Sequence, residues 1–186
     1  LLIVIVASIG FAEVQRQEYV SREAERIRLE QLGIEKARAA AIAAQQEAEL
    51  KKLEQPLPIN GVFKAANRSN INRYDSPPLK ISNAPGANTL MKLIRIKDNA
   101  EVMSIFIRAG QTVEVKVPLG SYKAKIASGQ TWYGDAVRFG PNTSYATLDT
   151  VLEFSIQGNQ LLGNELMLTR VRDGNLRQGP LSASEF

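Results

Sequence analysis

The sequence predicts an N-terminal transmembrane helix that continues into a long α-helix, followed by an all-β antiparallel sandwich or small barrel. Three observations lead to this fold class: an uncharged apolar run, a charged stretch without proline, and short segments in which apolar and polar residues alternate. We expect four parts: a partial transmembrane anchor (1–12), a charged helical spacer (13–54), a Pro/Asn-rich linker or arm (55–88) and a β domain (89–186).

The apolar run at residues 1–11 leads directly into charged sequence, as a chain does where it leaves a bilayer. Its anchoring side chains would be Leu1, Leu2, Ile3, Val4, Ile5, Val6, Ile9 and Phe11. As a helix the run extends about 16 Å, roughly half of a hydrocarbon core, so we expect it to be part of a longer span. An uncleaved secretory signal and a buried core helix remain as alternatives.

The spacer at residues 13–54 is rich in Glu, Gln, Arg, Lys and Ala, which favour a single long helix, and only Gly33 weakens it. A seven-residue stripe consists of Val20, Ile27, Ile34, Ala41 and Ala48. The positions three residues further on are half charged, so a coiled-coil seam is incomplete. We expect a helix that stands alone or lies against a partner, with weak self-association through residues 20–48 as the alternative.

Prolines at positions 56 and 58 end the helix, and the Asn-rich and Pro-rich sequence up to residue 88 predicts a linker that packs only in part. Alternating segments and Gly-containing or Asn-containing turns then predict strands. The predicted strands cover residues 90–97, 102–107, 112–117, 121–127, 150–156 and 161–171, and a last short strand follows Asn175. Short turns join the first four, so they would form a meander.

Composition excludes several kinds of chemistry. The chain has no Cys and no His, so a thiol nucleophile, a Cys/His zinc site, a haem-binding His and a Ser-His-Asp triad are absent. Asp135 and Asp149 form no recognisable acid–base constellation, and an enzyme using this carboxylate pair is a weak alternative. We expect no enzyme activity, no catalytic residue, no cofactor and no metal site.

Aromatic residues gather in the loop at 129–145, although only 6% of the chain is aromatic. The candidate partner or ligand contacts there are Trp132, Tyr133, Asp135, Arg138, Phe139 and Tyr145. Such rings cover the end of a β core, meet a protein partner, or stack on a sugar or base, and we prefer the first interpretation. In the third, Trp132 and Tyr133 would be the stacking platform of a glycan or cell-wall binding module.

Three segments of the β domain carry a resemblance to known sequences: residues 106–122, the Thr131-Trp132-Tyr133-Gly134 element, and residues 139–145. With them, the chain from Leu90 to Phe186 resembles a domain of uncharacterised bacterial proteins that commonly sits behind a single membrane anchor. The resemblance implies no activity, no cofactor and no functional residue.

These observations together predict a non-enzymatic, single-pass accessory subunit of a bacterial inner-membrane complex. The β domain would be periplasmic, since an apolar segment before a large C-terminal part often acts as a signal anchor. Its partners would be membrane lipid and other subunits, and nucleic acid is disfavoured. A glycan or cell-wall binding module outside the cytoplasm is the alternative function.

Overall fold

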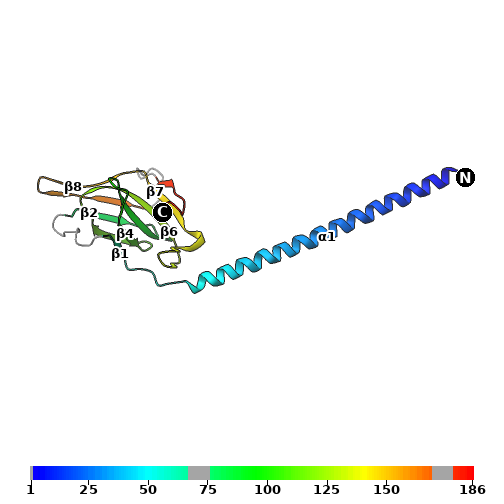
Figure 1. Ribbon diagram of the computed structural model, residues 1–186, viewed down its shortest axis with the longest axis horizontal. Coiled ribbons are helices and arrows are strands. Elements are labelled where there is room, and N and C mark those ends of the chain that lie inside the picture. The colour runs from blue at the N-terminus through cyan, green and yellow to red at the C-terminus, as the bar shows by residue number, and fades with distance from the viewer. Residues whose placement is uncertain (1, 67–75, 169–177) are drawn as a thin grey trace. The chain divides into compact units, whose positions relative to one another are not determined.

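The computed structural model describes residues 2–66, 76–168 and 178–186 and separates into two compact units, Leu1–Lys52 and Leu53–Phe186 (Figure 1). The first unit is helix α1 (Leu2–Lys52). The strands of the second are β1 (Gly61–Ala65), β2 (Pro78–Ser82), β3 (Asn88–Arg95), β4 (Glu101–Ile107), β5 (Thr112–Lys116), β6 (Gly120–Gly129), β7 (Ser144–Leu148), β8 (Leu152–Gln157), β9 (Gln160–Leu162), β10 (Asn164–Met167) and β11 (Gln178–Pro180).

Helix α1 confirms the prediction of one continuous long helix, because its 51 residues run through both the apolar run and the charged spacer. Ion pairs one turn apart, such as Arg26 with Glu23 at 2.5 Å, each add a few tenths of a kcal/mol. Nearly all of its side chains from Arg16 onward are exposed. Those of the predicted anchor lie outside the described side chains. In the part of the chain that the structure describes, no helix has an 18-residue stretch apolar enough to cross a membrane.

The β domain is a sandwich of two sheets, as predicted. In the larger sheet the strands follow the order β1-β4-β3-β6-β7-β11, and β8 and β9 extend it beside β6. The smaller sheet has the order β10-β2-β5. Neighbouring strands are antiparallel except β10 and β2, which run parallel.

The predicted meander is wrong, because β5 leaves the larger sheet. Strand β3 pairs with β4 on one side and with β6 on the other, while β5 pairs with β2 in the smaller sheet. Alternation in a sequence specifies which side chains share a face, but it does not specify which strand lies alongside. The apolar side chains of β3, β4 and β6 need a second layer to cover them, and β5 helps to form it.

The predicted linker at residues 55–88 differs most from the structure, because the β domain begins at Leu53 and includes β1 and β2. Leu79 and Ile81 of β2 are completely buried. Proline is tolerated at the first position of a strand, so Pro78 does not prevent pairing. The part of the predicted linker at residues 67–75 lies outside the described residues.

The main core fills the space between the two sheets. It is formed by alternate residues of the larger sheet, such as Met91, Ile105 and Ile126, and by Leu79 and Val115 of the smaller one. Each is buried to at least nine-tenths, and full burial of such a side chain contributes about 1.5–3 kcal/mol.

The predicted strand at 161–171 is divided into β9 and β10, between which the chain passes from the larger sheet to the smaller one. The break is at Gly163, where a Cβ atom would lie 2.0 Å from the carbonyl oxygen of Pro78. Residues 169–177, which include the predicted turn before the last strand, lie outside the described residues. Strand β11 agrees with that last strand, and β7 was not predicted.

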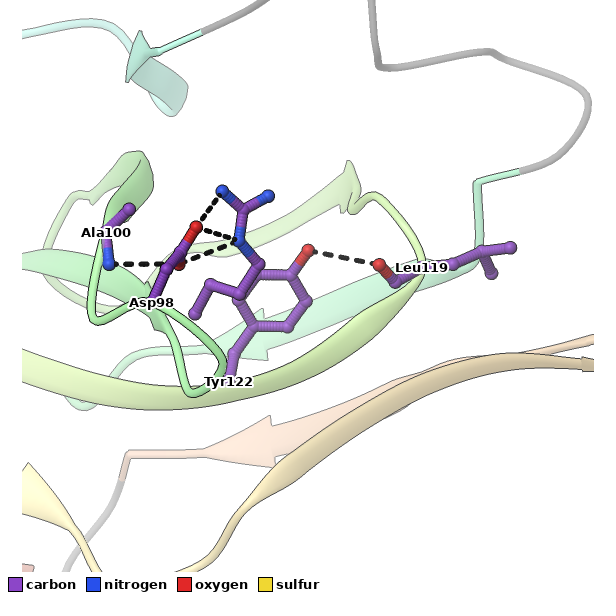
Figure 2. A network of polar contacts seen from close by, with 5 residues as sticks. Asp98, Ala100, Leu119 and Tyr122 are labelled. Atoms are coloured by element: carbon purple, nitrogen blue, oxygen red, sulfur yellow. Dashed lines mark hydrogen bonds and ion pairs between the residues drawn. The ribbon is translucent and has the colours of Figure 1, made fainter.

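A buried tyrosine marks the start of β6 (Figure 2). The Tyr122 hydroxyl donates to the carbonyl oxygen of Pro118 at 3.0 Å, and Leu119 lies next to it. This bond back to a residue four positions earlier is like the tyrosine corner of other β-sandwiches. Beside it, Arg95 donates to both carboxylate oxygens of Asp98 in the turn between β3 and β4. These bonds stabilise the connection before β6 and the turn between β3 and β4.

Candidate interaction face of the larger sheet

The larger sheet has a second, outer face, formed by the residues that alternate with the main core. In one row across it, Leu90 of β3 lies between Phe106 of β4 and Ala127 of β6, and Tyr145 of β7 follows. In the next row, Lys92 lies between Ser104 and Lys125, with Thr147 beyond. One row is therefore apolar and aromatic, and its neighbour carries two lysines directly opposite each other.

The aromatic loop covers the first row. Trp132 and Phe139 are each only 3% exposed and pack on Leu90, Phe106 and Ala127 as a second apolar cluster. The Trp132 ring meets those of Phe106 and Phe139 at centroid distances of 5.3 Å and approximately edge-on. Such aromatic pairs contribute about 0.5–1.5 kcal/mol beyond their buried area. These two rings therefore cover the outer face of the larger sheet, whereas the preferred interpretation placed them at the end of the β core.

Short-range bonds hold the loop in its shape. The amide of Tyr133 donates to the carbonyl oxygen of Arg138 at 2.8 Å. The amide of Arg138 in turn donates to the carbonyl oxygen of Gly134 at 2.7 Å. Arg138 has φ 56°, a left-handed conformation uncommon for residues other than glycine. Asp135 pairs with Lys64 of β1 at 2.5 Å. The position of the Arg138 side chain is thus set by the backbone of the loop.

The segment at residues 53–60 lies along the same region of the β domain. The amide of Gln55 donates to the carbonyl oxygen of Trp132 at 2.9 Å. Arg108 donates to the carbonyl oxygens of Leu57 and Pro58, both at 3.0 Å, and the Leu57 side chain packs on the Trp132 cluster. Sequence reasoning missed this contact, because Arg108 is 51 residues from Leu57 in the chain.

Basic and aromatic side chains surround the last residue on this face. Lys92 Nζ lies 4.8 Å from the centroid of the Phe186 ring, and Arg138 Cζ lies 4.8 Å from it as well. The Tyr145 ring is 5.4 Å from that of Phe186. Lys92 also donates to the Phe186 carbonyl oxygen at 3.2 Å, and Lys125 donates to the carbonyl oxygen of Glu185. We call Lys92, Lys125, Arg138 and Tyr145 the basic slot.

Charge in the basic slot is only partly balanced. Lys92 pairs with Glu101 of β4 at 3.0 Å. The Glu185 carboxylate accepts bonds from the amide and the hydroxyl of Ser182; these, with a smaller effect of Lys125, lower the pKa of Glu185 below its usual value. Arg138 Nε is buried and has no hydrogen-bond partner among the described residues.

The six predicted contact residues separate into four groups. Trp132 and Phe139 are buried, and Asp135 is held in an ion pair with Lys64. Arg138 and Tyr145 join the basic slot, and Tyr133 is half-buried at the base of the loop. The ring of Trp132 therefore offers no open face to a sugar, and nothing described here favours the glycan-binding alternative. Lys92 was missed, because it lies in a strand that looks unremarkable in the sequence.

The described residues contain no group of three or more Asp or Glu side chains that could hold a metal ion. Comparison of the chain with protein-family models, with curated proteins and with solved structures found no match. The resemblance to anchored bacterial β domains therefore stays a prediction.

Proposed function

We propose that this protein is a non-enzymatic accessory subunit in which α1 acts as a spacer and the β domain docks on a larger membrane protein complex. One observation carries the proposal: a 51-residue helix with almost all of its described side chains exposed precedes a compact β domain. Isolated helices derive little stability from propensity alone, and most helices are stabilised by packing. A helix of this length and exposure suits a protein that is assembled beside others.

The attachment to a bacterial inner membrane belongs to the same proposal. Its support is the apolar composition of residues 1–11, which carry no charge. They would contribute part of a span, with membrane lipid and neighbouring transmembrane helices as their surroundings, and the β domain would lie in the periplasm. The exposed stripe of Val20, Ile27 and Ile34 would contact a neighbouring helix or, weakly, a second copy of α1.

Gentle detergent extraction from the native membrane tests this function. The extract is separated by size, and every protein that stays with this chain is identified and quantified. We expect a stoichiometric set of membrane proteins, and we expect a chain without residues 1–12 to leave the membrane fraction. A chain that always runs alone as a monomer would contradict the docking function.

A further inference from the structure

The basic slot brings together more positive charge than its surroundings offset. Lys92 and Lys125 lie directly opposite each other on β3 and β6, and like charges in such cross-strand pairs are destabilising. Arg138 brings a third cation. Two described side-chain carboxylates, those of Glu101 and Glu185, are near these cations, and that of Glu185 is bonded to Ser182. An additional carboxylate at the slot would therefore be favourable.

A short segment of the chain itself now occupies the slot. The Phe186 ring lies 4.8 Å from both Lys92 Nζ and Arg138 Cζ, a distance at which a cation is attracted to an aromatic ring. The segment at 181–186 belongs to no strand, and residues 182–185 are exposed. Hydrogen bonds from Lys92 and Lys125 to its carbonyl oxygens hold its backbone on the sheet. Because this segment pairs with no strand, its replacement would leave the strand pairing of the sandwich intact.

We propose that the basic slot recognises an acidic peptide segment of a partner protein, in which a carboxylate stands beside an aromatic side chain. Residues 182–186 occupy the slot until that segment displaces them. The chain's own Glu185-Phe186 pair shows part of the chemistry that fits: a ring close to Lys92 and Arg138, and carbonyl oxygens bonded to the two lysines. A partner carboxylate that reaches Arg138 would supply the bond that Nε lacks. This inference rests on the proposed docking function and names its surface.

Fluorescence anisotropy with a labelled, C-terminally amidated peptide of residues 181–186 tests the slot directly. Three proteins are compared: the full chain, a chain shortened after Leu181, and the full-length Phe186→Ala variant. The last variant removes the ring from the slot and keeps the backbone of residues 182–186. We expect the peptide to bind both altered chains about tenfold more tightly than the full chain, because no internal segment competes. Equal affinity for all three proteins would overturn the proposal.

Matched variants separate recognition from general attraction. Arg138→Gln or Lys125→Gln in the shortened chain should weaken peptide binding about tenfold, whereas Lys116→Gln on β5 of the smaller sheet should leave it unchanged. Replacing Phe by Ala in the peptide should also weaken its binding about tenfold. Replacing Glu by Gln in the peptide should remove much of the salt dependence of its binding. A peptide without its Phe that binds equally well would contradict recognition of a ring.

Two further results distinguish failure of the slot from failure of the docking function. If membrane proteins still co-purify with the Arg138→Gln chain in the usual amounts, the docking function stands and the slot is not its surface. If the full chain forms a concentration-dependent dimer that is lost after removal of residues 182–186, the occupant is a second copy and the partner proposal is overturned.

Discussion

Tyr122 shows how one buried polar atom is satisfied at the edge of the core. Its side chain is completely buried, yet its hydroxyl reaches the carbonyl oxygen of Pro118. The ring meets that of Phe154 at 5.7 Å, so it belongs to the core as much as to the connection before β6.

Replacing Tyr122 by Phe should lower the free energy of unfolding by about 1 kcal/mol, since the ring stays and one hydrogen bond is lost. Burial raises the pKa of Tyr122. A raised folded-state pKa gives stability that is present below the unfolded value, about 10, and is lost as pH rises through the folded value. Urea unfolding from pH 7 to pH 11 should show a weaker alkaline loss in Tyr122→Phe than in the parent chain. Tyr19→Phe on the exposed part of α1 is the control.

The contribution of Asp98 to the stability of the fold has the opposite pH dependence to that of Tyr122. The hydrogen bonds from Arg95, together with the amide of Ala100, hold the pKa of Asp98 below its usual value. A lowered folded-state pKa gives stability that is present above the unfolded value, about 4, and is lost as pH falls through the folded value. Asp98→Asn should therefore destabilise the protein at pH 7 and lose its effect towards pH 3. A destabilisation that is the same at both pH values would contradict this ion pair; Glu153→Gln, on an exposed position of β8, is the control.

Opposite effects are expected from substituting two glycines, one between β9 and β10 and the other within α1. Gly163→Ala should destabilise the β domain by several kcal/mol, because the added Cβ would overlap the Pro78 carbonyl oxygen where the chain changes sheets. Gly33→Ala should stabilise α1 by about 1 kcal/mol, since nothing lies within 4 Å and alanine favours helix. Trp132 fluorescence should report the first change and helical circular dichroism the second. A Gly163→Ala protein as stable as the parent would show that the chain between β9 and β10 does not pass this close to Pro78 of β2.

The chain as a whole consists of two units that should respond separately to a protease. Trypsin should cut the exposed helix, with Lys51 and Lys52 among its sites, and release a β domain that begins near Leu53. Because Trp132 is the chain's only Trp and is buried in that domain, the fragment should keep the emission of the intact protein. Rapid digestion of both units together, or a red-shifted fragment, would contradict two separate units.

Several features follow from the sequence by itself. The helix is specified by residues that favour helix through many successive turns, and Asp98-Asn99 and Gly158-Asn159 mark turns between strands that the structure contains. Alternation along residues 112–117 specifies which of its side chains are buried. The lack of Cys and His excludes thiol and imidazole chemistry whatever the fold. Each of these properties depends on residues close together in the chain or on composition, so no long-range contact is needed to derive them.

Only the tertiary structure decided which strands pair and where the candidate site lies. The exchange of β5 to the smaller sheet depends on β2, whose Pro78 and whose neighbours Pro77 and Asn83 resemble a linker in composition. The basic slot and its occupant bring together Lys92, Lys125, Arg138 and Phe186. These residues are up to 94 positions apart and meet through the register of β3 with β6 and the return of residues 181–186 to the sheet. Sequence patterns report local periodicity, whereas pairing is selected by the burial of two sheets against each other, which is a property of the complete β domain.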